Sequence, residues 1–162
     1  MTTCYPDSIK VKRDIQRRIE DHVIKYCETL EENFKQYSLR SFQRNIEEQR
    51  FPENTKYYQD RVDEINNGTA NLYKFVFKTG KKFHKVYFLQ YEEASEYYGT
   101  KAGYKSGSVH AFIDKHTGEV YKPASWKAPA KHVSFDMRII KEREFLHNPA
   151  NVDWAGGHLY MR

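Results

Sequence analysis

The sequence predicts an α+β fold in which N-terminal helices pack on a small, mainly antiparallel sheet of two or more hairpins. Apolar residues recur every three to four positions through most of the first 66 residues, which is the period of a helix. From about residue 71 the period changes to two, which is the period of a strand. Glycine-containing turns separate these alternating segments, as expected of hairpins.

The chain of 162 residues is expected to form one domain, 1–162. It divides into a helical part (1–70), a β part rich in lysine and aromatic residues (71–131) and a C-terminal part (132–162) that packs back on the domain. Aromatic residues make up 15% of the chain, which is atypical of a disordered protein.

The cysteine count and the hydropathy of the chain indicate in which cellular compartment the protein is expected. Cys4 and Cys27 are the two cysteines, too few for a secreted disulfide scaffold. No signal peptide is recognisable after Met1, and no apolar run approaches the roughly 18 residues of a membrane span. We therefore expect a soluble protein that stays inside a cell and contacts no membrane.

The first helix is predicted over roughly 8–36. Pro6-Asp7-Ser8 is typical of a helix start, with Asp7 or Ser8 as the N-cap. Its apolar stripe could form a coiled coil or a partner-binding face, but packing on the protein's own sheet is the favoured interpretation. The stripe consists of Val11, Ile15, Ile19, Val23, Cys27, Leu30 and Phe34.

Two further helices are expected before the sheet. One opens at Ser38 or Ser41 and is ended by Pro52, because proline disrupts a helix interior. The other covers roughly 54–66 and is stopped by the Asn66-Asn67-Gly68 segment, whose residues tolerate positive φ.

A first hairpin is expected from strands at 71–78 and about 82–91 around a turn at 79–81. Strand alternation gives it one aromatic face and one mixed, lysine-bearing face. Tyr73, Phe75 and Phe77 share one face of the first strand. In the second strand, alternation separates His84, Val86 and Phe88 from Phe83, Lys85, Tyr87, Leu89 and Tyr91.

The next segments are expected to alternate between loops and a second hairpin. Glu92–Glu96 suggests a short helix, and Gly99–Gly107 a flexible loop. Strands at 109–114 and 119–122 flank a turn at 115–118.

The remaining segments end the chain. Two prolines predict an extended, stiff loop over 122–131. Residues 132–146 mix strand and helix character, and the apolar end at 153–160 is expected to pack back on the domain.

The charge lies unevenly along the chain. The net charge is +5 overall, −1 over residues 1–70, +6 over 71–131 and zero over 132–162. All cations of the middle part are lysines, which suit phosphate backbones more than the reading of base edges. The alternative is a sheet whose lysines protect its edges from aggregation. These lysines are Lys74, Lys78, Lys81, Lys82, Lys85, Lys101, Lys105, Lys115, Lys122, Lys127 and Lys131.

No catalytic or metal motif is recognisable, and the sequence favours a binding role over an enzyme and predicts no cofactor. No His-x-x-x-His or Cys-x-x-Cys pair is present. Asp114, Glu119 and Lys122 resemble the acid–acid–lysine set of a metal-dependent nuclease, but a spacing of three puts Glu119 and Lys122 on opposite strand faces. Ser125 has lysines nearby but no recognisable base or elbow motif.

The candidate binding residues centre on the segment 121–132, where aromatic rings and lysines lie on a proline-stiffened chain. Trp126 could stack on a base while the lysines neutralise phosphates, or it could fill the core while the lysines are solvated. The set, extended by the 99–107 loop, is Lys101, Tyr104, Lys105, Tyr121, Lys122, Trp126, Lys127 and Lys131, with no metal ligand and no catalytic residue.

One segment carries a resemblance. Residues 108–131, SVHAFIDKHTGEVYKPASWKAPAK, are similar to a stretch shared by small uncharacterised proteins of tailed bacteriophages of the marine and cyanophage type. The Asp153–Gly157 segment resembles the C-terminus of the same family, so the likeness covers about the last 60 residues. It implies a phage source, with the host cytoplasm during infection or the virion as location, and it implies no catalytic residues.

Three functions follow as hypotheses. The first is a phage accessory protein that binds nucleic acid, with a single strand as the favoured ligand and with low sequence specificity, or another polyanion, through the lysine and aromatic β surface. The second is a virion structural or assembly protein whose partner is a phage protein. The third is a counter-defence protein that captures a host factor or a nucleotide signal.

Overall fold

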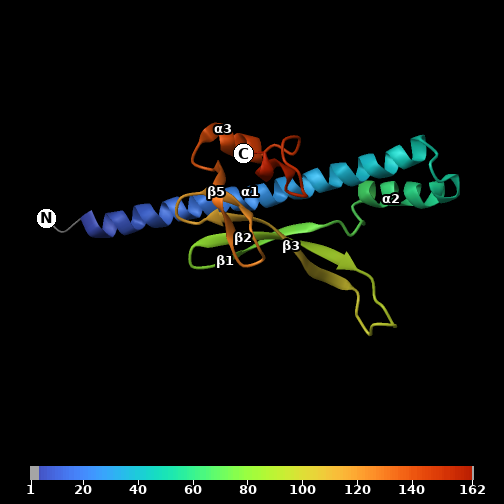
Figure 1. Cartoon of the computed structure of the whole chain (residues 1–162), viewed down its shortest axis with the longest axis horizontal. Helices are drawn as coiled ribbons and strands as arrows, with labels where there is room; N and C mark the ends of the chain where they lie inside the picture. Colours follow the sequence, from blue (N-terminus) through green and yellow to red (C-terminus); the bar gives the residue numbers. More distant parts are fainter. Residues whose placement is uncertain (1–3, 162) are drawn as a thin grey trace.

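One long helix, α1 (Cys4–Glu47), packs against a five-stranded antiparallel sheet in the computed structural model (Figure 1). The structure describes residues 4–161, with side chains from residue 8 onward. The predicted α+β class, with N-terminal helices on an antiparallel sheet of hairpins, is confirmed.

Helix α1 is longer than the sequence pattern predicts. The first helix was expected to end near residue 36 and a second to open at Ser38 or Ser41, but the helix is continuous to Glu47. No glycine or proline interrupts this part of the chain, and Ser38 is buried against the rest of the fold. The helix also begins at Cys4, before the expected cap, so Pro6 lies in its first turn, where proline is tolerated.

The chain then turns through a short 3-10 helix, η1 (Pro52–Asn54), into α2 (Thr55–Asn67). Pro52 was expected to end the preceding helix, but α1 ends earlier, at Glu47, and Pro52 begins η1. Helix α2 confirms the helix expected over 54–66. Helix α2 lies beside the C-terminal end of α1 (Figure 1). It ends at Gly68, whose φ of 75° is a left-handed conformation that glycine adopts without strain.

The sheet is a meander in which each strand pairs with its sequence neighbour, in the order β1-β2-β3-β4-β5. Both predicted hairpins are present, β1 with β2 and β3 with β4. A third hairpin, β4 with β5, was not predicted. The strands are β1 (Lys74–Thr79), β2 (Phe83–Glu92), β3 (Gly103–Asp114), β4 (Glu119–Pro123) and β5 (Pro129–Asp136).

Three local predictions between the strands were wrong. Residues 92–96 end strand β2 and enter a turn closed by a bridge between Ser95 and Thr100, so no helix forms there. Strand β3 begins at Gly103, inside the segment expected to be a flexible loop, because the long β2 continues to offer backbone partners. The stiff loop of 122–131 shrinks to 124–128, since Pro123 and Pro129 occupy strand ends, where a missing N–H is tolerated.

Two register shifts interrupt the pairing of β2 with β3 next to Phe88, whose ring belongs to an aromatic stack. The rings of Phe34, Tyr73 and Phe88 lie parallel, with centroids 4.3 and 4.9 Å apart. A Cβ atom at Gly107 would overlap the Phe88 ring, so the stack requires glycine at this position. Helix α1 is thereby joined to the start of the sheet through stacked rings.

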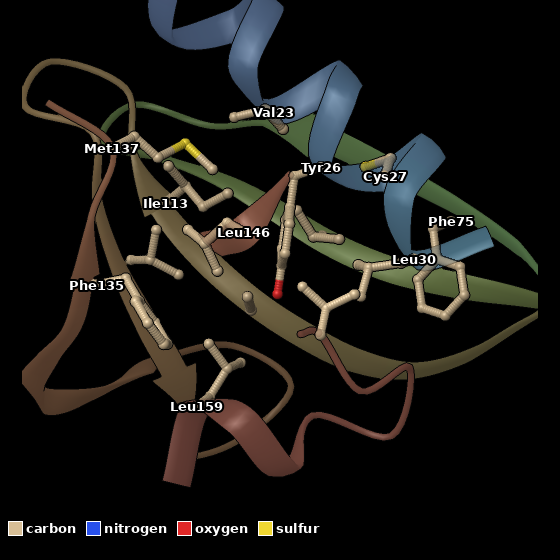
Figure 2. Packing of buried hydrophobic residues seen from close by; sticks show 14 of the residues in the cluster. Val23, Tyr26, Cys27, Leu30, Phe75, Ile113, Phe135, Met137, Leu146 and Leu159 are labelled. Carbon is tan, nitrogen blue, oxygen red and sulfur yellow. The ribbon is translucent and has the colours of Figure 1, made fainter. Parts of the chain in front are cut away.

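The core lies between α1, the sheet and the C-terminal segment (Figure 2). Val23, Tyr26 and Leu30 of α1 are fully buried against sheet residues such as Ile113. The C-terminal segment packs back as predicted: α3 (Ile140–Leu146) and the 3-10 helix η2 (Gly157–Tyr160) contribute Leu146 and Leu159, which are also fully buried.

A buried polar network crosses this core. The Tyr26 hydroxyl lies 2.7 Å from Nε2 of both His110 and His158. The backbone N–H of Asp153 donates to Nδ1 of His158, so this ring carries its proton on Nε2 and donates it to Tyr26. Tyr26 in turn donates to His110, whose Nδ1–H donates to the Trp154 carbonyl oxygen.

Burial keeps all three side chains of this network neutral. Desolvation lowers the pKa of His110 to about 3 and that of His158 to about 4, and it raises the pKa of Tyr26 well above its usual value. A neutral chain of donors and acceptors satisfies every one of these buried groups, which makes the network a structural feature of the core.

Candidate nucleic-acid interface

Five lysines gather where the β1–β2 and β3–β4 turns meet, and we call this set the lysine corner: Lys78, Lys81, Lys82, Lys85 and Lys115. Lys78 and Lys85 are cross-strand partners in the β1–β2 pair, and Lys81 and Lys82 occupy its turn. The backbone N–H of Lys115 donates to the Lys82 carbonyl at 3.0 Å, which fixes the two turns side by side.

Among the described side chains, the ammonium groups of the lysine corner form no ion pair. Every ion pair of residues 8–161 is formed by residues outside this set. The Lys115 ammonium donates to the carbonyl oxygen of Gly80, an acceptor that carries no net charge. Uncompensated cations close together on a surface raise the local positive potential and attract anions.

Aromatic rings border the lysine corner. The Lys85 ammonium lies 4.5 Å from the centroid of the Trp126 ring and donates to the Trp126 carbonyl at 2.9 Å. The Trp126 ring meets Tyr87 edge to face at 5.7 Å, and the Lys78 ammonium lies 6.0 Å from the Tyr87 ring. Trp126 is 45% exposed, so the indole neither fills the core nor extends freely into solvent.

The turn between β4 and β5 holds Trp126 in this position. The Ser125 hydroxyl accepts hydrogen bonds from the backbone N–H groups of Lys127 and Ala128. The N–H groups of Ala124 and Ser125 donate to the Ala128 carbonyl, which closes the turn from the other side. Ser125 therefore acts as a turn residue, and no general base contacts its hydroxyl in the described part of the chain.

Only part of the predicted set of binding residues lies at the lysine corner. Trp126 and the exposed Lys127 border the lysine corner. Lys101 lies in the loop that joins β2 to β3, and Lys105 forms an ion pair with Glu92 at 2.8 Å. Tyr104 donates its hydroxyl to the Leu72 carbonyl, far along the β2–β3 hairpin from the turn that carries the lysine corner.

The other three predicted residues make different contacts, although the Tyr121 ring packs on Phe83, over which the Lys82 ammonium lies. Tyr121 is half-buried and donates its hydroxyl to Glu119. The Lys122 ammonium lies 4.7 Å from the ring of Tyr160, in the C-terminal 3-10 helix. Lys131 is exposed on β5. The eight predicted residues are thus brought to several places and do not form one surface.

The residues that the candidate set missed are those of the lysine corner and Tyr87. Strand alternation already placed Lys85 and Tyr87 on one face of β2. The position of Lys78 opposite Lys85 could have been inferred by counting outward from the 79–81 turn. The contact of Lys115 with the other turn has no sequence signal, because it depends on how two hairpins pack in space.

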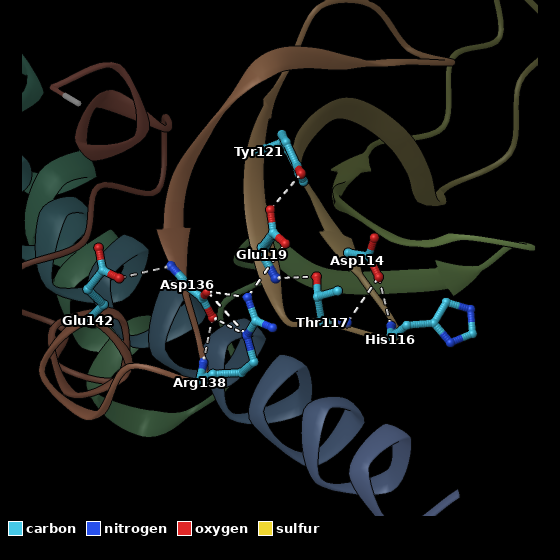
Figure 3. Close-up of polar contacts among 8 residues, drawn as sticks. All are labelled: Asp114, His116, Thr117, Glu119, Tyr121, Asp136, Arg138 and Glu142. Carbon is cyan, nitrogen blue, oxygen red and sulfur yellow. Dashed lines mark hydrogen bonds and ion pairs between the residues drawn. The ribbon is translucent and has the colours of Figure 1, made fainter. Parts of the chain in front are cut away.

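The acidic residues near the β3–β4 turn form a separate polar cluster (Figure 3). Asp114 is buried and accepts the backbone N–H groups of His116 and Thr117. Arg138 pairs with Asp136 through two nitrogens and with Glu119 at 3.6 Å, and this pairing lowers the pKa of Asp136. These carboxylates hold turns and an arginine in place.

Neither a metal centre nor a reactive thiol is found at these positions. In the part of the chain that the structure describes, no three His, Cys, Asp or Glu side chains are placed to hold a metal ion. Burial raises the pKa of the Cys27 thiol to about 12, which leaves it protonated and unreactive.

A pocket of about 600 Å³ lies between α1, α2 and the segment before β1. Its lining includes Arg61, which is paired with Glu64, together with Glu93 and the rings of Phe42 and Tyr91. Two carboxylates against one guanidinium make this pocket a poor site for an anion. The lysine corner is therefore the better candidate for a polyanion interface.

The fold and this surface define a small α+β protein with a basic, aromatic-bordered sheet end. A family of unknown function, DUF7717, matches residues 3–161, and the chain belongs to this family. No curated protein and no solved structure matches it. Among residues 4–161, no helix is both long enough and apolar enough to cross a membrane.

Proposed function

We propose that the protein binds single-stranded nucleic acid with low sequence specificity through the lysine corner and Trp126. One observation carries the proposal: among the described side chains the five ammonium groups of the lysine corner form no ion pair, and that of Lys85 lies 4.5 Å from the centroid of the half-exposed Trp126 ring. Cations beside an accessible ring are the combination that single-strand binding requires, because phosphates take the charge and bases stack on the ring.

The chemistry of the corner favours affinity without sequence reading. Lysine offers a hydrated point charge and lacks the planar fork with which arginine reads guanine. Stacking on an aromatic ring tolerates every base and contributes about 1–3 kcal/mol per base. Low specificity and strong salt dependence are the expected signature. In the phage setting that the sequence resemblance implies, the protein acts in the host cytoplasm during infection.

Fluorescence anisotropy with a labelled 30-nucleotide single strand over a salt series tests the proposal. The K81Q/K82Q variant removes two exposed charges from the β1–β2 turn. For a single strand, each lost phosphate contact reduces the slope of log affinity against log salt by about 0.7. We expect the slope of the variant to be about 1.4 smaller than that of the wild type.

The matched control is K56Q/K141Q, which removes two exposed lysine charges from α2 and α3. It lowers the net charge equally but leaves the lysine corner intact, so its slope should equal that of the wild type. Equal slopes for K81Q/K82Q and the wild type, or wild-type binding that ignores salt, would overturn the proposal.

A second candidate function is assembly with another protein, which the tip of the β2–β3 hairpin favours. Tyr97 and Tyr98 are 89% and 78% exposed there, with ring centroids 4.8 Å apart. Tyrosine offers a large, rigid contact area, and serine and glycine beside it are typical of adaptable binding loops. Mass spectrometry of purified phage particles tests this candidate, and absence from the particles would remove it.

A further inference from the structure

The first turns of α1 form a basic arm, defined as residues 8–18, that extends past the end of the sheet (Figure 1). Every residue from Ser8 to Ile15 is exposed. Contact with the body begins at Gln16, whose side chain is hydrogen-bonded to His116, and at Ile19, which lies under the β3–β4 turn beside Gly118. The contacts that the structure shows between the arm and the sheet thus lie at the C-terminal end of the arm.

The charge of the arm is opposite to that of the helix that follows. Its eleven residues hold one acidic side chain, Asp14, and five basic ones, for a net charge of +4. None of these cations forms an ion pair within the described side chains. The five are Lys10, Lys12, Arg13, Arg17 and Arg18.

The arm lies at the same end of the molecule as the lysine corner. The hydrogen bond between Gln16 and His116 anchors the arm to the β3–β4 turn, and Lys115 is the preceding residue of that turn. Lys115 in turn contacts the β1–β2 turn through Lys82 and Gly80. One continuous set of contacts therefore joins the arm to the proposed single-strand site.

The cations surround the arm rather than following one side. At 3.6 residues per turn, Lys10, Arg13 and Arg17 share one face, while Lys12 and Arg18 project to its two sides. A helix about 10–12 Å across fits the B-DNA major groove, which is about 12 Å wide and has phosphates along both rims. Cations on several sides of a helix match that arrangement.

Two other occupants fit the arm less well. Helices that lie on membranes gather Trp, Phe or Leu on one face, whereas the arm has none of these and carries Ile9 on a different side from Val11 and Ile15. A coiled coil with a second copy would need a longer apolar stripe through the arm, where the stripe consists of Val11 and Ile15 alone and Lys12 lies one turn from Ile15 on the same face.

We propose that the basic arm binds duplex DNA, lying in the major groove next to a single strand held at the lysine corner. This inference rests on the proposed function and deepens it, because the protein then recognises a junction between single-stranded and double-stranded DNA. The arm supplies phosphate contacts to both rims of the groove, and the corner holds the strand that leaves the duplex.

The test compares R13Q/R17Q with R40Q/R44Q. Both variants replace two exposed arginines four residues apart on α1, but the second pair lies near the opposite end of the helix. Anisotropy is measured over a salt series on a 30-base-pair duplex, a 30-nucleotide single strand and a junction of the two. Thermal unfolding checks that both variants fold as the wild type does.

For R13Q/R17Q we expect the salt slope on the duplex and the junction to be about 1.8 smaller than for the wild type, since each lost contact to B-DNA contributes about 0.9. Its slope on the single strand should stay near the wild-type value. The control should match the wild type on all three probes.

The outcomes separate the two proposals. If R13Q/R17Q binds the duplex as the wild type does, or the wild type binds only single strands, the arm proposal is overturned while the single-strand site stands. If R13Q/R17Q weakens duplex binding but K81Q/K82Q leaves single-strand binding unchanged, the single-strand site at the lysine corner is overturned, while duplex binding by the arm is supported. Binding to phosphatidylglycerol vesicles alone, lost in R13Q/R17Q, would assign the arm to membranes and overturn both proposals.

Discussion

The phenol oxygen of Tyr26 and Nε2 of His158 lie 2.7 Å apart in the centre of the core, and this contact sets the direction of the buried network. Because the backbone N–H of Asp153 occupies Nδ1 of His158, the ring must donate to Tyr26. The Tyr26 hydroxyl must then donate onward to His110. Four predictions on stability and exposure follow from this and neighbouring features.

The Y26F variant should lose roughly 2–6 kcal/mol of unfolding free energy. Removing the hydroxyl leaves Nε2 of both His110 and His158 buried without a partner, and each such group costs about 1–3 kcal/mol. Urea denaturation at pH 7.5 measures the change. The control, Y98F, removes a hydroxyl that is mostly exposed and should leave stability unchanged. Equal midpoints for Y26F and the wild type would contradict this account.

Stability should fall as the pH drops below 6.5. The pKa of His110 is about 3 and that of His158 about 4 in the folded protein, against an ordinary value of 6.5. Between these values the unfolded chain binds more protons, so stability is complete above pH 6.5 and is lost toward pH 4. Each histidine contributes about 1.4 kcal/mol per pH unit within this window.

Urea midpoints between pH 7.5 and 4.5 measure this dependence. The H132N variant serves as the control because His132 is exposed, and its pH dependence should follow the wild type. A stability that is level across the range would show that the two buried rings are not the neutral groups described above.

The G107A variant should destabilise the fold by roughly 1–3 kcal/mol, the usual cost of forcing an extra group into a packed site. The added methyl group would overlap the Phe88 ring and displace it from its stack on Tyr73. Near-ultraviolet circular dichroism and thermal unfolding measure the effect. In the control, G80A, the nearest atom to the new methyl is the Phe83 carbonyl oxygen at 3.6 Å, so little change is expected.

Trp126 should be the more accessible of the two tryptophans. Trp154 packs edge-on against Phe34 at 5.0 Å, whereas Trp126 is 45% exposed. In a W154F variant, acrylamide should quench the remaining fluorescence readily, and a single-stranded oligonucleotide should reduce that quenching. A W126F variant should be quenched less and should not respond to the oligonucleotide. The reverse order would contradict the placement of the indole.

Local patterns predicted the hairpins well because their cause is local. Alternation of Phe75 and Phe77 with Lys74 and Lys78 is set by the pleat itself, and the register confirms the face assigned to each. The end of α2 at Gly68 was predicted for the same kind of reason, since few residues adopt its backbone angle.

The errors arose where tertiary packing overrides local preference. Ser38 suggested a helix start, yet it lies buried inside α1, and packing against the fold favours continuation. Lys105 was assigned to the candidate binding set, yet Glu92, thirteen positions earlier, compensates its charge across the hairpin. Neither contact can be inferred from residues that lie next to each other in the chain.

The 44-residue length of α1 also fixes a distance. At 1.5 Å per residue the helix measures about 66 Å, and no proline or glycine after its first turn offers a hinge. The basic end and the end that meets α2 therefore belong to one continuous helix, which keeps them at a constant distance from each other. A partner that binds the basic end therefore also fixes the orientation of the end that meets α2.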